Sequence, residues 1–313
     1  MIKLDLVTGF LGSGKTTFII EYVRFLHARG ERVAVVVNDH GAINVDRMLI
    51  EDAVGDICHV EMVIGGDIDC HKRRLKTKLI SLALGMGEIE DGTETSVGVP
   101  DRVIIEPSGI FDTEEFFNLI YEAPLTKWYE IGNVITLVNA EVDGSLSKES
   151  RYMIASQSAN AGMLLVTHLP ESADSKRQAR ETLAFVNDCL EEFRCDRRLE
   201  EVLCMEPSGA DEGTMEKIAS CGYVGGDLLH LPVAENGHFE SKFFFHLKLP
   251  EETLCDSVRE MMQDPSHGDV IRLKGFQQKA DGTWIEVNAT RTKVEIKPIA
   301  TGQEVYILIS EHK

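Results

Sequence analysis

The chain has few basic residues relative to its acidic ones. Lys and Arg number 32 against 52 for Asp and Glu, which gives a formal net charge of −20 at pH 7. A general nucleic-acid-binding protein needs a basic face for phosphate contacts, and an anionic membrane surface also favours cationic segments. The charge balance therefore argues against both kinds of partner.

Cysteines and long apolar runs are also scarce. The seven cysteines in 313 residues are scattered and show no C-x-x-C spacing, which argues against a disulfide framework. Hydrophobic residues make up 43% of the chain, but no run approaches the roughly 20 residues of a membrane span. Residues 1–7 are too short an apolar stretch for a signal peptide. We therefore expect a cytoplasmic protein.

Nearly continuous apolar strands alternate with segments of helical periodicity through the first two thirds of the sequence. Strands buried on both faces and separated by helices predict an α/β domain with a mostly parallel sheet and helices on both faces. Gly85–Pro100 is polar, rich in glycine and without a period, and predicts a loop or surface excursion. The expected strands are Lys3–Val7, Arg32–Asn38, Asp101–Glu106, Asn133–Asn139, Gly162–Thr167 and Val202–Met205, and the expected helices are Thr16–Arg29 and Lys176–Cys195.

The character of the sequence changes between residues 225 and 237. From Phe239 onward, four alternating strand patterns surround one helical segment, Glu251–Gln263. We therefore predict two domains, one spanning 1–225 and a small C-terminal α+β domain spanning 238–313.

The strongest motif is the segment Gly9–Thr16, GFLGSGKT, which matches G-x-x-x-x-G-K-[ST]. It follows a predicted strand and opens a predicted helix, as this phosphate-binding loop (P-loop) requires. Glycines allow backbone N–H groups to surround phosphate oxygens at a helix N-terminus. Lys15 is expected to contact the β- and γ-phosphates, and the Thr16 hydroxyl is expected to bind Mg²⁺.

Two other strands end in residues suited to the same site. Glu106 closes one strand and is the carboxylate expected to reach the metal, while Gly109 is expected to bring a backbone N–H toward the γ-phosphate. Asp39 ends another strand and is expected to reach Mg²⁺ or the attacking water. An ordinary strand-to-loop turn is the alternative for Asp39. Lys15, Asp39 and Glu106 are the predicted catalytic residues.

Four segments together resemble the CobW-type P-loop GTPases, relatives of the nickel-enzyme maturation GTPases. They are GFLGSGKTT (9–17), VVNDHGAINVD (36–46), the glycine pair and cysteine at 65–70, and IIEPSG (104–109). HGDVIRLKGFQ (267–277) resembles the family's C-terminal domain. The resemblance therefore covers nearly the whole chain. It implies GTP and Mg²⁺ as cofactors and a role in zinc, cobalt or cobalamin metallocentre assembly.

The resemblance also assigns residues. Asp39 stands where the family has Glu in N-E-F-G, and Glu106 with Gly109 matches its E-x-x-G. The positions that match phosphate and Mg²⁺ binding are Gly12, Ser13, Gly14, Lys15, Thr16 and Thr17.

The family's metal motif, G-C-x-C-C, is altered here to Gly66-Asp67-Ile68-Asp69-Cys70. In an extended segment Asp67 and Asp69 project to one side, so both carboxylates can face one ion with Cys70 or His71 nearby. Oxygen ligands favour harder ions than three thiolates do. We expect a weak, exchangeable site for cobalt, iron, manganese or loosely held zinc. The alternative is a turn that has lost metal transfer.

The guanine-reading N-K-x-D of the family is altered as well. Thr167 and His168 stand at its first two positions and are the predicted base contacts, but Pro170 replaces the aspartate. Guanine therefore loses a charged acceptor, and ATP remains an alternative to GTP.

Two further features, a pair of Cys-His dipeptides and a basic run, could bind a metal or a partner, but each also has a purely structural explanation. Cys58-His59 and Cys70-His71 invite a zinc site, but neighbouring residues in a strand point to opposite faces, which favours a packed Cys58. The run His71–Lys76 offers charges for phosphate or an acidic partner, yet it is more typical of the solvated face of a helix.

These observations predict a switch that hydrolyses a nucleoside triphosphate and acts as a metallochaperone or metalloenzyme activator. Its expected partner is a client metalloprotein or metallocofactor protein, and a nucleotide-dependent homodimer stays open. Slow intrinsic turnover is expected because no arginine finger is evident. The alternatives are a nucleotide-gated scaffold with incidental hydrolysis and a P-loop small-molecule kinase.

Overall fold

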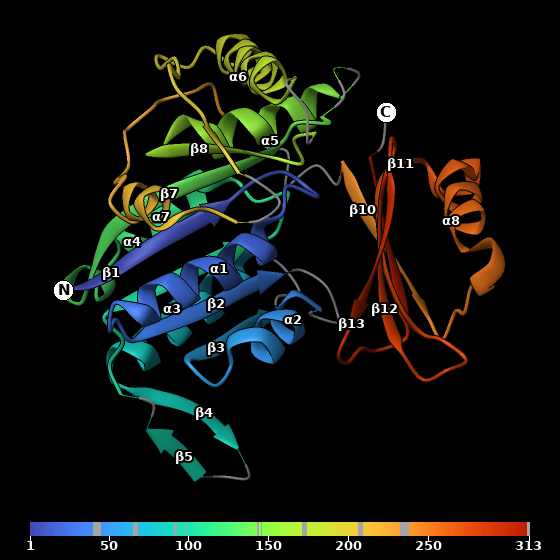
Figure 1. Cartoon of the computed structure of the whole chain (residues 1–313). Helices are drawn as coiled ribbons and strands as arrows, with labels where there is room; N and C mark the ends of the chain where they lie inside the picture. The colour runs from blue at the N-terminus through green and yellow to red at the C-terminus, as the bar shows by residue number, and fades with distance from the viewer. Residues whose placement is uncertain are drawn as a thin grey trace. The chain divides into compact units, whose positions relative to one another are not determined.

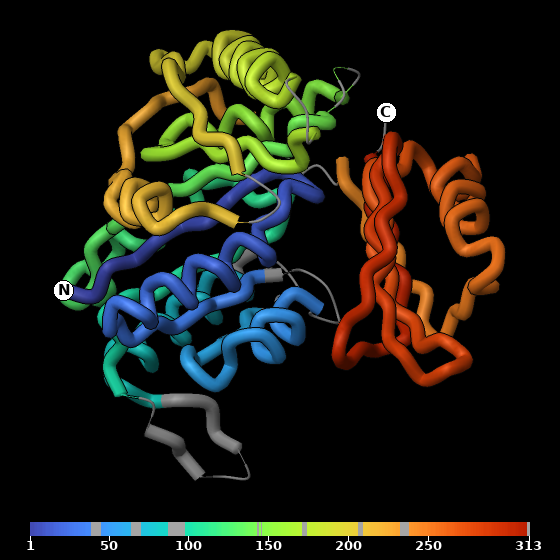
Figure 2. Tube along the Cα trace, viewed as in Figure 1, coloured from blue at the N-terminus to red at the C-terminus, as the bar shows by residue number. Residues whose placement is uncertain are grey.

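The computed structural model describes residues 1–39, 45–64, 68–90, 93–96, 98–142, 144, 146–170, 174–205, 209–231 and 238–311 (Figures 1 and 2). Within these ranges the side chains of residues 39, 64, 68, 69, 87–90 and 93–96 are not described. The chain divides into two compact units, Met1–His230 and Leu231–Lys313. The predicted end of the first domain, residue 225, falls five residues earlier, because the segment up to Leu229 hydrogen-bonds to the first unit.

A seven-stranded sheet forms the centre of the first unit, in the order β3-β2-β6-β1-β7-β8-β9. Every neighbouring pair is parallel, as the alternation of apolar strands with helices predicts. The strands are β1 (Ile2–Thr8), β2 (Val33–Asp39), β3 (Cys58–Ile64), β6 (Arg102–Pro107), β7 (Tyr129–Asn139), β8 (Met163–Thr167) and β9 (Leu203–Cys204).

Helices cover both faces of this sheet (Figure 1). One face packs against α3 (Ile68–Ala83) and α4 (Thr113–Ile120). The opposite face packs against α1 (Lys15–Ala28), α2 (Val45–Val54) and α7 (Glu212–Ala219). The remaining helices of the unit are α5 (Lys148–Ala159), α6 (Ser175–Glu192) and the short η1 (Leu125–Lys127).

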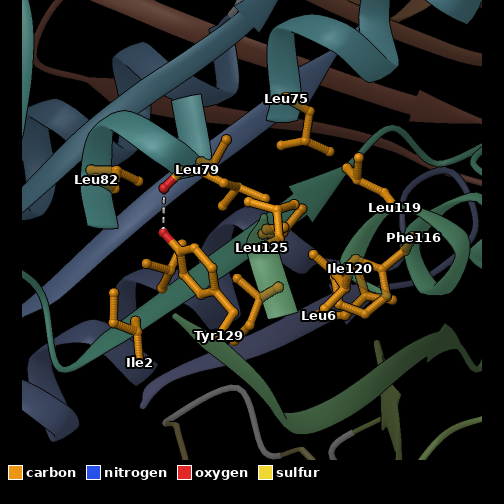
Figure 3. Packing of buried hydrophobic residues seen from close by; sticks show 14 of the residues in the cluster. Ile2, Leu6, Leu75, Leu79, Leu82, Phe116, Leu119, Ile120, Leu125 and Tyr129 are labelled. Carbon is orange, nitrogen blue, oxygen red and sulfur yellow. Dashed lines mark hydrogen bonds between the residues drawn. The ribbon is translucent and has the colours of Figure 1, made fainter. Parts of the chain in front are cut away.

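Figure 3 shows apolar side chains of the core on the α3 and α4 face, with one hydrogen bond between the residues drawn. Leu79 of α3 and Phe116 of α4 are both at most 1% exposed, and burial of each such side chain contributes about 1.5–3 kcal/mol. The Tyr129 hydroxyl donates to the Leu79 carbonyl at 2.7 Å. Burial raises the pKa of this phenol, so it stays a neutral donor that fixes α3 on the sheet.

The segment Gly85–Pro100 was predicted to be a loop or a surface excursion, and its described residues form an excursion outside the seven-stranded sheet. It contains the antiparallel pair β4 (Met86–Glu90) and β5 (Thr93–Ser96). The sequence of these strands is polar, so it lacks the apolar alternation by which strands are recognised.

The second unit is a five-stranded antiparallel sheet with one α-helix. The strand order is β10-β14-β11-β12-β13. Leu254 and Val258 of the helix pack on Leu273 and Tyr306 of the sheet. The strand β13 escaped prediction because lysine, glutamate and proline interrupt its pattern. The elements are β10 (Phe239–Phe245), η2 (Glu251–Thr253), α8 (Leu254–Gln263), η3 (Pro265–His267), β11 (Asp269–Gln278), β12 (Trp284–Thr290), β13 (Val294–Ile299) and β14 (Val305–Glu311).

Among the described residues, none of the helices is long and apolar enough to cross a membrane.

Candidate nucleotide-binding site

The P-loop connects the end of β1 to the start of α1, in the context that the motif requires. Gly14 is the N-cap of α1 with φ 87°, and no side chain caps the helix. The first N–H groups of α1 are thus available to an anion. The Lys15 side chain is buried to 7% exposure, and its Nζ donates to the Gly9 carbonyl at 2.8 Å. The lysine therefore folds back over its own loop.

A glycine of the E-x-x-G motif lies directly against this loop. A Cβ added to Gly109 would lie 2.6 Å from Leu11 Cδ2 and 2.9 Å from the Leu11 backbone nitrogen. Only glycine permits so close an approach of the two backbones. The structure thus brings Gly109 to the P-loop, as expected of a residue near the γ-phosphate.

Thr16 lies between two carboxylates. Its Oγ1 is 2.8 Å from Glu106 Oε1 and 2.9 Å from Asp46 Oδ1. A hydroxyl carries one hydrogen and can donate to only one of these oxygens at a time. A hydroxyl with two carboxylate oxygens is a hard oxygen donor set of the kind that Mg²⁺ prefers. These three residues therefore fit a magnesium ion that also contacts phosphate.

The Ser13 hydroxyl supplies a second sign that the loop is built for a ligand. It is buried and makes no hydrogen bond with the part of the chain that the structure describes. A Cβ on Gly9 would come within 2.5 Å of this oxygen, so the hydroxyl faces the interior of the loop. A bound phosphate would give it an acceptor.

The predicted base contacts adjoin the loop at the end of β8. The Thr167 hydroxyl donates to the Ser13 carbonyl at 2.9 Å. His168 adopts the left-handed conformation with φ 56°, which is uncommon outside glycine. Its Cε1 lies 3.7 Å from the position of a Cβ on Gly14, and its Nδ1 lies 3.0 Å from Thr167 Oγ1. The imidazole thus lies over the start of α1.

Other predicted phosphate residues have less specific surroundings. Gly12 has φ 75°, and its carbonyl accepts from Asn139 Nδ2 at 3.4 Å. Thr17 is exposed in the first turn of α1.

Several predicted metal residues lie outside the description. Asp39 ends β2, but its side chain is not described, and Asp67 lies outside the described residues altogether. The extended geometry predicted for this motif is wrong from Ile68 onward, because α3 begins there. Asp69, whose side chain is not described, and the half-buried Cys70 are therefore in the first helical turn. A helix places successive side chains about 100° apart, so alternation does not govern their direction.

The two Cys-His pairs do not form one site with the side chains that are described. Cys58 is 8% exposed in the apolar core, and burial raises the pKa of its thiol to about 12. His59 Nε2 instead lies 2.7 Å from Glu61 Oε1, while Lys78 Nζ donates to Glu61 Oε2 at 2.6 Å. Across the described residues, no three His, Cys, Asp or Glu side chains are grouped to hold a metal.

The basic run at the start of α3 also has a structural explanation. Lys72 and Lys76 both bind the Glu122 carboxylate, at 2.6 and 2.9 Å. These charge-assisted bonds lower the pKa of Glu122 to about 2. His71 differs from the predicted solvated face, because it is 4% exposed.

Asp46 is the site residue that sequence reasoning missed. It lies in the first turn of α2, next to Thr16 in space but thirty residues away in sequence. An acidic residue in the first turn of a helix is common, so the sequence around Asp46 does not by itself indicate a ligand. The sequence feature that points to it is its position at the end of the 36–46 segment, which resembles a family motif.

Comparison with known proteins agrees with this geometry. Residues 4–192 match the model of the family described as CobW/HypB/UreG, nucleotide-binding domain. The chain belongs to this family.

Curated CobW/HypB/UreG relatives include two proteins of Escherichia coli. The zinc chaperone YeiR is 25% identical over 179 residues, which cover 57% of this chain and 50% of YeiR. The zinc chaperone YjiA is 29% identical over 190 residues, which cover 59% of this chain and 55% of YjiA. The chain thus spans about half the length of these relatives. The solved structure of the zinc-bound YjiA GTPase aligns over 99% of this chain and 94% of its own, with a TM-score of 0.42 and 15% identity.

Proposed function

We propose that this CobW/HypB/UreG member hydrolyses GTP with Mg²⁺ and uses the cycle to deliver a metal to, or activate, a client metalloprotein. The observation that carries the proposal is Thr16 Oγ1, held 2.8 Å from Glu106 and 2.9 Å from Asp46 beside the P-loop. An oxygen site at that position serves a metal–triphosphate complex.

Each part of the nucleotide has a proposed partner in the first unit. The N–H groups around Gly14 and the Lys15 ammonium bind phosphate oxygens, and Gly109 lies at the γ-phosphate side. Thr16, with Glu106 and Asp46, holds Mg²⁺, which neutralises phosphate charge when bound. The base lies beside His168.

Asp46 takes over part of the role predicted for Asp39. Asp39 ends β2 and Asp46 lies seven residues later in α2, and the described contact with Thr16 is made by Asp46. Asp39, whose side chain is not described, remains our candidate for a further contact to Mg²⁺.

The proposed cargo is a transition metal held at residues 67–70. Two carboxylates and one thiolate favour harder ions and faster exchange than three thiolates. Relatives bear the name zinc chaperone, so zinc is the first metal to test, followed by cobalt(II).

Slow turnover in isolation follows from the motif residues. Neither segment 9–17 nor segment 104–109 contains an arginine. An arginine that contacts the transferred phosphoryl group raises kcat about 10³- to 10⁵-fold. We propose that the client protein, or a second copy of the chain, completes the site in the cytoplasm.

Metal analysis with and without nucleotide tests this function. The purified chain is loaded with zinc or cobalt(II), desalted with GDP or a non-hydrolysable GTP analogue, and analysed for bound metal. Metal content should depend on the nucleotide, and Cys70→Ala should remove that dependence. Cys255→Ala, in α8 of the other unit, is the matched control. Equal metal content in all nucleotide states would contradict a delivery cycle and favour a scaffold.

A further inference from the structure

The side chain of Asn38 is buried and makes no hydrogen bond with any residue that the structure describes. It is 1% exposed, and neither its amide nitrogen nor its amide oxygen has a partner among the described residues. A buried carboxamide loses up to four hydrogen bonds that it makes in water. Such a residue is unfavourable for stability unless a ligand or water supplies the partners.

Other buried asparagines of the same unit show what structural asparagines do here. Asn187 donates to the Leu199 carbonyl and accepts from the Leu199 nitrogen, at 3.0 and 2.8 Å. Asn133 contacts Asp5, Tyr22, Ala219 and Gly222. Asn139 binds the Gly12 carbonyl and the Glu141 nitrogen. Asn38 differs from these three, because its amide makes no such contact with the described part of the chain.

The register places Asn38 at the nucleotide edge of the sheet. It is aligned with Pro107, while its predecessor Val37 is aligned with Glu106. Thr8 ends the strand on the other side of β6, two residues beyond the Leu6–Ile105 pair. Asn38 and Thr8 therefore flank Pro107 at one level. Thr8 Oγ1 is also fully buried without a partner among described residues.

Alternation sets the face of the sheet on which this pair lies. Val36 and Leu6 belong to the core under α3 and α4, so Asn38 and Thr8, two residues on, point to that face. Glu106 points to the opposite face, toward Thr16. The proposed Mg²⁺ ligands and the Asn38 side chain therefore lie on opposite faces of the sheet, on either side of the E-x-x-G loop.

We propose that Asn38 positions the attacking water for GTP hydrolysis. Its Oδ1 accepts a hydrogen bond from the water, its Nδ2 donates to a γ-phosphoryl oxygen, and the Thr8 hydroxyl binds a second water. The water oxygen forms a bond to the γ-phosphorus. The bond from this phosphorus to the β–γ bridging oxygen breaks, its electron pair goes to GDP, and both protons of the water end on the released dihydrogen phosphate.

This inference rests on the proposed GTP hydrolysis. A carboxamide suits the task of orienting water against phosphate. One planar group offers a donor and an acceptor together, as needed to orient water against phosphate.

The test uses Asn38→Ala, Asn38→Asp and Asn38→Leu in the full chain. We measure single-turnover phosphate release, the Kd for a non-hydrolysable GTP analogue, and the thermal midpoint without nucleotide. All three variants should slow hydrolysis about 10²-fold and change the Kd less than about threefold. Asn38→Leu should keep or raise the midpoint, because it removes two unpartnered buried polar atoms. Asn187→Leu, the structural control, should lower the midpoint.

Three results would overturn the inference. They are an unchanged hydrolysis rate in Asn38→Ala, a rate loss explained by weaker nucleotide binding, and an Asn38→Leu midpoint lowered as in the Asn187→Leu control. Wild-type chain that binds no GTP at all would instead contradict the proposed function.

Discussion

The Thr16 hydroxyl lies 2.8 Å from Glu106 Oε1, although ninety positions separate the two residues in the sequence. The first residue is in the opening turn of α1, and the second is at the end of β6. Parallel strands bring their carboxyl ends, and the helices that follow them, to one edge of the sheet. This convergence makes a metal–phosphate site from residues that no local pattern connects.

Asp46→Asn should weaken the Mg²⁺ requirement without unfolding the chain. Loss of one anionic oxygen ligand removes a charge-assisted contact of about 1.5–3 kcal/mol, so the Mg²⁺ concentration for half-maximal GTP hydrolysis should rise about 10- to 150-fold. Steady-state phosphate release over a Mg²⁺ series measures it.

The control for Asp46 is Asp52→Asn, an exposed carboxylate on the same helix. It should leave the Mg²⁺ profile unchanged. If both variants behave alike, Asp46 acts only through the general field of α2.

Arg102→Met should destabilise the first unit strongly. The Arg102 guanidinium donates to buried Asp5 at 2.7 Å, with the two side chains 3% and 0% exposed. Removing one partner leaves a buried charge and costs about 3–5 kcal/mol. Urea denaturation followed by far-UV circular dichroism measures the change.

Arg32→Met is the matched control for the buried pair. Arg32 lies 2.9 Å from Asp101, but their side chains are 65% and 45% exposed. The hydrogen bond from Arg32 holds the pKa of Asp101 at about 2, so this pair contributes above pH 4 and fades as the pH falls through about 2. Exposed ion pairs contribute about 0–1 kcal/mol, so Arg32→Met should lower the free energy of unfolding less than Arg102→Met does. A larger decrease in Arg32→Met would contradict this prediction.

Base selectivity should be weak because the Pro170 side chain offers no acceptor for guanine. A lost charge-assisted bond is worth about 1.5–3 kcal/mol, so GTP and ATP should compete within about 100-fold. Pro170→Asp should raise the preference for GTP. Competition against a fluorescent GTP analogue measures both, and a thousandfold GTP preference of the wild type would contradict the prediction.

The sheet and the phosphate loop were predictable because both leave local signals. The valine-rich run of β2 and the glycine spacing of residues 9–14 follow from burial and backbone geometry over a few neighbouring positions. Glu106 was predictable because it ends a strand in the same sheet.

Other features depend on contacts that the sequence does not display. The meeting of Asp46 with Thr16 requires α1 and α2 to pack side by side. The helical start of α3 replaces the extended conformation predicted for residues 68–70. The hairpin β4–β5 has polar strands, and β13 contains Pro298, so periodicity detects neither. In each case the conformation or contact depends on tertiary packing, which the local sequence pattern does not determine.

The most direct test of the account is GTP turnover by the wild type and Lys15→Ala in the presence of Mg²⁺. The wild type should release phosphate slowly, and Lys15→Ala should show neither detectable binding nor hydrolysis, because the charge at the β- and γ-phosphates is lost. Lys176→Ala, an exposed lysine of α6, should match the wild type in turnover, and far-UV circular dichroism should show that all three proteins are folded. Hydrolysis by Lys15→Ala at the wild-type rate would contradict the nucleotide site.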